Sequence, residues 1–151
     1  MLTLRIPPLL LTLLFACVMT VVAIATPAIS LNAPALLWAG SAIVLAGIAV
    51  CAGGVLAFRR AGTTVDPTRP EKASALVRSG IYRFTRNPMY LGFMLLLVGL
   101  GVLLGHPAAL VTALAFVPYM NRFQIEPEEE ALTRLFGDEF ERFRREVRRW
   151  L

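Results

Sequence analysis

Two short polar segments carry the side chains of this chain that are best suited to chemistry. The first, residues 79–92, reads SGIYRFTRNPMYLG, in which Asn87 fits an N-cap and Pro88 fits the first position of a helix. The unpaired N–H groups at such a helix start attract a carboxylate or phosphate. The alternative interpretation is a well-capped helix whose Tyr82 and Tyr90 lie at a membrane interface.

The second segment, residues 126–130, reads EPEEE and places four carboxylates close together. Pro127 fits a helix start, and the acids fit its first turn. So many negative charges near an anionic membrane surface require a cation. That cation is either supplied by the chain's own arginines or belongs to a ligand held between this segment and the helix that starts at Pro88.

The elements that position these segments follow from where charge is missing. No Asp, Glu, Lys or Arg occurs between Ile6 and Phe58, or between Asn87 and Asn121. A membrane-spanning helix needs about 20 mostly apolar residues. The chain is therefore predicted to be an all-α integral membrane protein with about four transmembrane helices, at residues 9–25, 35–58, 89–104 and 108–121. The last two form a short helical hairpin that turns at residues 105–107.

The positions of the fifteen basic residues predict the topology. One is Arg5, seven lie between residues 59 and 86, and seven lie between residues 122 and 149. The positive-inside rule then places the N-terminus, the middle loop and the C-terminal tail in the cytoplasm. An alternative treats Arg5 and the apolar run that follows as a cleaved signal peptide, which leaves three spans. The ratio of fourteen Arg to one Lys suggests a GC-rich genome and a bacterial inner membrane.

The tail after residue 122 has the pattern of an amphipathic cytoplasmic helix with a bend at Gly137. Its apolar residues recur at helical spacing, and its arginines, Arg149 among them, fall on the opposite face. The apolar stripe consists of Leu132, Phe136, Phe140, Phe143, Val147 and Leu151. Overall, residues 1–58 are predicted to form a two-helix membrane anchor, and residues 59–151 a core made of the loop, the hairpin and the tail.

Several other kinds of site are not predicted. There is no phosphate loop, serine elbow or His/Cys cluster, so no metal is expected. Cys17 and Cys51 lie in apolar runs as small hydrophobes, and His106 is interpreted as structural. Gly99, Gly101 and Gly105 favour close helix packing over nucleotide binding. The basic residues flank membrane helices without interleaved stacking residues, so the expected partner is the lipid bilayer and not nucleic acid.

Taken together, the two segments resemble the isoprenylcysteine carboxyl methyltransferase family, within the wider group of membrane methyltransferases that includes phospholipid methyltransferases. The family's Ser-Gly-x-Tyr turn and Arg-His-Pro-x-Tyr-x-Gly stretch correspond to residues 79–82 and 86–92. Its acidic pair followed by Leu and Phe-Gly corresponds to Glu128, Glu129, Leu132 and residues 136–137. The resemblance covers residues 65–150.

The resemblance implies S-adenosyl-L-methionine as methyl donor at the cytoplasmic membrane face, with in-line transfer to a lipid-like acceptor that enters sideways from the bilayer. In this reading the start of the helix at Pro88 receives the methionine carboxylate, Glu128 holds the ammonium or ribose hydroxyls, and tyrosine faces attract the sulfonium. The implied cofactor-binding residues are Ser74, Ala75, Leu76, Val77, Tyr82, Arg86, Asn87, Pro88, Met89, Tyr90, Glu128 and Glu129.

Two positions depart from the family pattern. Asn87 stands where the family usually has His, which puts the role of that imidazole in doubt. Gln124 stands where enzymes that methylate a carboxylate carry an arginine, and Arg122, two residues away, is a possible substitute. Arg122 and Asn87 are therefore the predicted catalytic residues, and Arg122 and Gln124 the predicted substrate-binding residues.

The leading hypothesis is a methyltransferase that acts on a prenylcysteine-type carboxylate or a related amphiphile. A second hypothesis is N-methylation of an amine-headed phospholipid, which needs no arginine clamp. A third is a non-catalytic membrane scaffold, which predicts no cofactor binding and tolerance of substitution at Tyr90 and Glu128.

Overall fold

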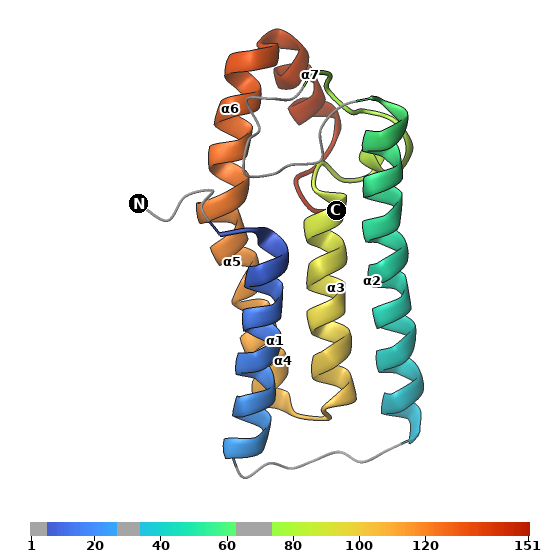
Figure 1. Cartoon of the computed structure of the whole chain (residues 1–151), viewed down its shortest axis with the longest axis vertical. Coiled ribbons are helices and arrows are strands. Elements are labelled where there is room, and N and C mark those ends of the chain that lie inside the picture. Colours follow the sequence, from blue (N-terminus) through green and yellow to red (C-terminus); the bar gives the residue numbers. More distant parts are fainter. Residues whose placement is uncertain (1–5, 27–33, 63–73) are drawn as a thin grey trace.

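The computed structural model describes residues 6–26, 34–62 and 74–151, and every regular element in these ranges is a helix. The main helices lie side by side as an elongated bundle, and the C-terminus lies beside the start of the third helix (Figure 1). Arg5, most of the predicted turn at residues 26–34, and Arg69 and Lys72 of the polar loop lie outside the described residues.

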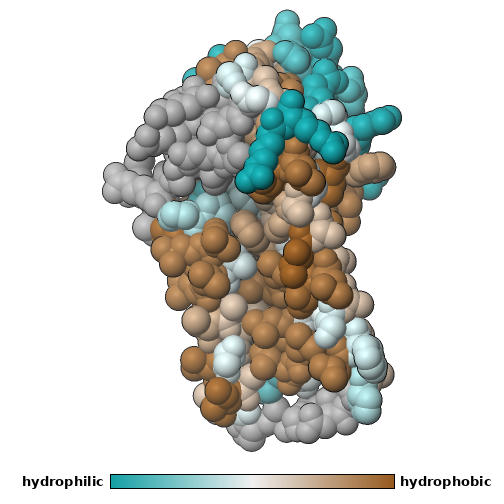
Figure 2. Space-filling model, turned by 45° about the vertical axis from the view of Figure 1, so that its right-hand side comes forward, coloured by the Kyte–Doolittle hydropathy of each residue, from teal (hydrophilic) through white to brown (hydrophobic). Residues whose placement is uncertain are grey.

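Helices α1 (Pro8–Ala25) and α2 (Pro34–Arg60) are long and apolar enough to cross a membrane. Large apolar side chains on them face outward, including Leu13, Ile24 and Trp38, and Ile24 is 81% exposed. Figure 2 shows this apolar surface along most of the molecule, with hydrophilic residues gathered at one end. Because water does not tolerate so extended an apolar surface, these helices require a lipid environment. The prediction of an all-helical protein with membrane-capable helices is therefore confirmed.

Helix α3 (Pro88–Leu103) is followed by α4 (Pro107–Leu114), which runs back alongside it (Figure 1). The chain reverses at Gly105, whose φ of 59° suits glycine. His106 follows and is buried, with its Nε2 atom 3.0 Å from the Thr26 hydroxyl at the end of α1. His106 thus has a partner on another helix, which fits its predicted structural role.

The returning arm is longer than predicted. After α4 come α5 (Phe116–Met120), a π-helical turn η3 (Asn121–Ile125) and α6 (Glu126–Phe136), interrupted only at Ala115. Pro118 and Pro127 lack the N–H groups that would bond the carbonyls four residues earlier. At the second proline the helix widens, and the Glu126 N–H donates to the Asn121 carbonyl. The predicted end at residue 121 and fresh start near Pro127 are therefore wrong: the helix continues.

The tail consists of two helices and an extended end. Gly137 has φ 49° and ψ −124°, which ends α6 before α7 (Asp138–Glu146) begins. The predicted bend at Gly137 is thus a helix break. Val147 is already extended, with φ −124° and ψ 134°, and Leu151 is 70% exposed. The prediction of a helical stripe that continues to Leu151 is wrong for these last residues.

The apolar side of the tail covers the C-terminal end of α2 and the segment before α3. Phe140 and Phe143 are buried, and Leu132, Phe136 and Val147 pack against them. Their partners are Ala57, Val77 and Tyr82, of which Tyr82 lies in the short 3-10 helix η2 (Gly80–Arg83). A second buried cluster fills the bundle below and joins Leu11 and Met19 of α1 to Tyr90 and Leu97 of α3.

Helices α2 and α3 pack through glycines, backbone against backbone. A Cβ atom added at Gly92 would lie 2.8 Å from the Gly47 carbonyl oxygen and 3.0 Å from the Cys51 nitrogen. Further along α3, a Cβ atom added at Gly99 would lie 3.0 Å from the Gly40 carbonyl oxygen. The predicted packing role of Gly99 is confirmed, and the close approach fixes where the start of α3 lies relative to α2.

We expect Gly92→Ala to destabilise the protein by about 1–3 kcal/mol, because the added methyl group must push two backbones apart. Gly53→Ala is the matched control, since a Cβ there meets the Ile81 side chain at an ordinary 3.5 Å. Thermal unfolding in the same detergent is the measurement. Equal midpoints for the two variants would show that the two helices have room to separate.

Candidate active site

The 3-10 helix η2 and the side chain of Tyr82 within it order the first polar segment. Gly80 takes φ 61°, which lets the chain turn into η2. Tyr82 is buried, and its ring meets that of Phe58 on α2 edge to face, with 5.4 Å between the ring centroids. Val77 packs in the same cluster, so the end of residues 74–77 is fixed beside Tyr82, while Ser74 is exposed.

Helix α3 begins as predicted, with Pro88 in its first turn and Asn87 at the N-cap position. The Asn87 side chain, however, makes no capping hydrogen bond. Its Nδ2 atom donates instead to the Arg149 carbonyl at 2.9 Å. The predicted side-chain cap is therefore wrong, because the extended C-terminal segment competes for that amide.

Tyr90 and Glu128 join the two predicted motifs directly. The buried Tyr90 hydroxyl donates to Glu128 Oε2 at 2.9 Å. Burial raises the pKa of Glu128 to about 7, the hydrogen bond from Tyr90 lowers it, and the charge of Glu129 adds to the increase. Burial also raises the pKa of Tyr82 above its usual range, and the charge of Glu128 adds to that increase. One carboxylate thus bonds one phenol, that of Tyr90, and acts electrostatically on a second, that of Tyr82.

Glu129, the neighbouring acid, is buried and held by two arginines. Arg149 donates to it twice, from Nη2 at 2.7 Å and from Nε at 3.2 Å, and Arg86 Nη1 lies 3.1 Å from Oε1. Glu126 pairs with Arg122 at 3.1 Å and lies 4.0 Å from Arg149. The sequence predicted that either the chain's own arginines or a cationic ligand would pair with these acids, and arginines pair with Glu126 and Glu129. Within the described part of the chain, Glu128 makes no ion pair.

Arg86 is the cationic counterpart of this site. Its side chain is only 10% exposed. Its Nη1 atom forms the ion pair with Glu129, whereas its Nε atom is buried without a hydrogen-bond acceptor among the described residues. Burial lowers the pKa of the Arg86 guanidinium, and Glu129 opposes that effect. Arg86 therefore has an unused N–H group beside the start of α3, where a small anion is favoured.

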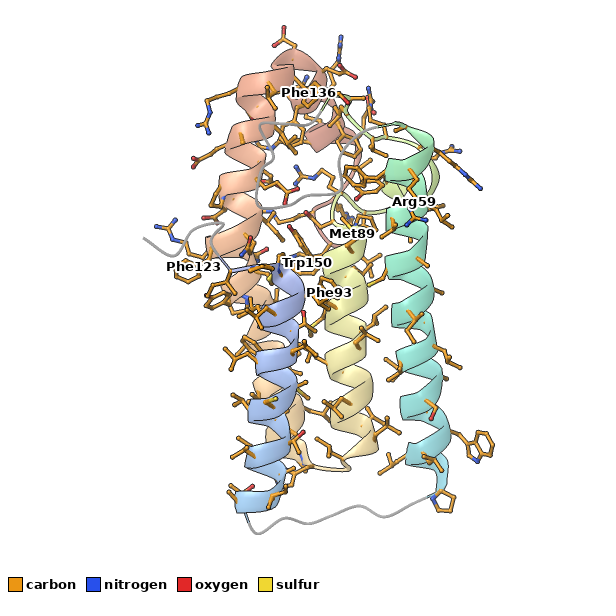
Figure 3. The ribbon with its side chains drawn as sticks, viewed as in Figure 1. Arg59, Met89, Phe93, Phe123, Phe136 and Trp150 are labelled. Carbon is orange, nitrogen blue, oxygen red and sulfur yellow. The ribbon has the colours of Figure 1, made fainter. Side chains whose placement is uncertain are left out.

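The remaining predicted residues lie differently. The Arg122 side chain is 76% exposed and bonds Glu126 on its own helix. Gln124 is 1% exposed, and its Nε2 atom donates to the Ile6 carbonyl at 2.8 Å. Met89 packs against α2, where its side chain lies against Gly54 (Figure 3). The structure thus gathers Tyr82, Arg86, Tyr90, Glu128 and Glu129, and leaves Arg122 outside this group.

Arg149 was missed as a site residue. The prediction placed it on a solvent-facing side of a helix, whereas it follows the end of α7 and bonds Glu129. Trp150 was also missed: its indole N–H donates to Asn121 Oδ1 at 2.9 Å, and it packs on the same buried cluster as Phe93 (Figure 3). The available signal was the acidic run itself, which needs more than one cation.

A family model described as phospholipid methyltransferase matches residues 35–139. Because that is more than half of the chain, this protein belongs to the phospholipid methyltransferase family.

Among individual proteins, the protein-S-isoprenylcysteine O-methyltransferase of Schizosaccharomyces pombe is 35% identical over 83 residues, which cover 53% of this chain and 34% of that protein. Protein-S-isoprenylcysteine O-methyltransferase B of Arabidopsis thaliana is 31% identical over 96 residues, 62% of this chain and 47% of that protein.

An uncharacterised protein of Haemophilus influenzae is 41% identical over 63 residues, which are 42% of this chain and all of that protein. No solved structure matches significantly. The chain thus spans a third to a half of the length of the relatives named as methyltransferases. The predicted resemblance to this family and to its isoprenylcysteine methyltransferase members is confirmed.

We expect Glu128 to titrate near pH 7, and Tyr90→Phe to raise its pKa further, because the variant loses a hydrogen bond to the ionised form. Carbon NMR of protein labelled at glutamate carboxyls, with Glu128→Gln to assign the signal, measures both values. A Glu128 pKa near 4.5, unchanged by Tyr90→Phe, would contradict the buried contact.

Proposed function

We propose that this protein transfers a methyl group from S-adenosylmethionine to a lipid-like acceptor at the membrane, with a prenylcysteine-type carboxylate as the first candidate. The observation that carries the proposal is the hydrogen bond between Tyr90 and Glu128. It brings together the two motifs on which the resemblance rests, next to an acid that no arginine neutralises within the described residues.

The described residues fit the chemical groups of this cofactor. Its ammonium and sulfonium are cations, and Glu128 with the faces of Tyr82 and Tyr90 suits a cation. Its methionine carboxylate suits the free Nε of Arg86 and the start of α3. When bound, the cofactor supplies a methyl group already activated by the positive sulfur.

The chain's own residues then have to position the reactants and keep water away. Tyr90 and Tyr82 are buried, so their rings exclude solvent from the Glu128 carboxylate. A low-dielectric site strengthens the attraction of Glu128 for a cation, and a fixed orientation removes much of the entropic cost of bringing two molecules together. Tyr90 restricts the carboxylate by its hydrogen bond. The other predicted contacts, Ser74 to Leu76, Asn87 and Met89, remain part of the proposal.

The proposed setting is a bacterial inner membrane crossed four times, by α1, α2, α3 and the arm formed by α4 and α5. Both termini, the site and the paired helices α6 and α7 then face the cytoplasm. The hydrophilic end of the molecule is the end that carries α6 and α7, which supports this orientation (Figures 1 and 2). The acceptor would reach the site from the bilayer. Residues 1–58 serve as anchor and residues 59–151 as core.

The positions of Arg122 and Gln124 favour a second class of acceptor. Arg122 points into solvent beside Glu126, and Gln124 is committed to the Ile6 carbonyl. Neither is placed to clamp a substrate carboxylate. An amine-headed phospholipid needs no such clamp, so N-methylation of phosphatidylethanolamine is the alternative activity.

We expect the purified protein to bind S-adenosylmethionine saturably, and Glu128→Gln to weaken binding about tenfold or more, because a buried charged contact is lost. Glu130→Gln removes the same charge from an exposed position of α6 and is the matched control. Calorimetry in detergent is the measurement. No binding by a folded parent protein would reject the enzyme and leave the scaffold hypothesis.

The acceptor is decided by transfer of a labelled methyl group. We expect label in the ester of a farnesylcysteine analogue if the carboxylate hypothesis holds, and in the headgroup of phosphatidylethanolamine vesicles if the alternative holds. Glu128→Gln should lower either signal by at least tenfold, because the variant binds S-adenosylmethionine more weakly. Label in neither acceptor from a protein that binds the cofactor would point to a different amphiphile.

A further inference from the structure

Residues 147–151 follow α7 without regular secondary structure and lie across the start of α3. We call residues 147–151 the C-terminal strap. Its carbonyls accept three hydrogen bonds from the first motif: Arg148 O from the Arg86 N–H at 3.0 Å, and Arg149 O from Asn87 Nδ2 at 2.9 Å and Thr85 Oγ1 at 3.2 Å. Thr85 is buried beneath it. The strap is therefore held against the first motif by hydrogen bonds.

The same strap also holds the second motif. The guanidinium of Arg149 donates two hydrogen bonds to Glu129 on α6. Beyond it, the Trp150 indole N–H donates to Asn121 at the first residue of the π-helical turn. One residue, Arg149, thus binds the first motif through its carbonyl and the second through its side chain.

The geometry points to Arg149 as a positioning residue of the cofactor site, which balances Glu129 so that Glu128 is left as the anion for a cationic ligand. This inference rests on the proposed function.

The charges around Glu128 show why balance matters. Tyr90 from α3 and Tyr82 from η2 face it, and Glu129 adjoins it on α6 with Arg86 and Arg149 behind. An unbalanced Glu129 favours the protonated form of Glu128 and so raises its pKa. Protonated Glu128 does not attract a cation. Removing Arg149 should therefore weaken cofactor binding most at low pH.

The test compares binding of S-adenosylmethionine by four full-length proteins between pH 6 and pH 9: the parent, Arg149→Gln, Arg149→Lys and Arg148→Gln. Arg148 is the matched control, because its side chain is exposed and only its backbone carbonyl contacts the first motif. Thermal unfolding of each variant identifies those that remain folded.

We expect Arg149→Gln to bind about tenfold more weakly at pH 7 than Arg148→Gln, with the pH at which binding is half lost moved upward. Arg149→Lys restores the charge, so this pH should return to the parent value even if the two-point contact does not re-form. A purely structural strap would lower affinity equally at every pH.

Three results would overturn the inference. They are equal affinity of Arg149→Gln and Arg148→Gln, an unshifted pH profile in Arg149→Gln, or, where that variant does not fold, a displaced profile in folded Arg149→Lys. In each case the parent still binds the cofactor and the proposed function stands. If the parent itself binds none, the proposed function fails and the inference fails with it.

Discussion

The candidate site depends on an almost continuous helical path, broken only at Ala115, from the reversal at Gly105 to the acids of α6. Tyr90 and Glu128 are 38 residues apart, and they meet because the returning arm stays helical through Pro118 and Pro127. Where lipid surrounds a helix, a missing backbone hydrogen bond finds no replacement in water. At Pro127 the chain shifts to a π turn, in which the Glu126 N–H still finds the Asn121 carbonyl. Such turns are rare and often mark functional sites.

Charge compensation then decides which acid is available for a ligand. Burying a carboxylate without a partner is costly, and losing one partner of a buried ion pair is costlier still. Glu129 is held by two arginines, and the half-exposed Glu126 by solvent and Arg122. Among the described residues, Glu128 receives only a phenol hydroxyl, which is a weaker partner than a guanidinium. A partly buried acid that no described arginine pairs with, in a site with two tyrosines, is suited to a cation that arrives from outside the chain.

The sequence predicted the parts of this protein that are governed by local patterns. The apolar runs predicted α1, α2 and α3 within about two residues at each end, and the start but not the end of α4. Pro88 indicated the start of α3, and the motifs assigned Tyr90 and Glu128 to one site, where they are hydrogen-bonded. What it did not reveal depends on conformations and backbone contacts. The φ and ψ angles of Gly137 and Val147 end helices that the apolar periodicity would have continued. The strap is recognised through the carbonyls of Arg148 and Arg149, which no side-chain pattern reports.

The amino-terminal helix has a closer connection to the site than its proposed role as an anchor suggests. The family match begins at residue 35, after α1. Yet Gln124, inside the π turn, donates to the Ile6 carbonyl just before α1, and Asn121 at the other end of that turn accepts from Trp150 of the strap. The turn that places Glu128 is therefore held from both ends of the chain. These two contacts tie the π turn to residues at both ends of the chain, and the same turn leads into the α6 segment that presents Glu128 to Tyr90.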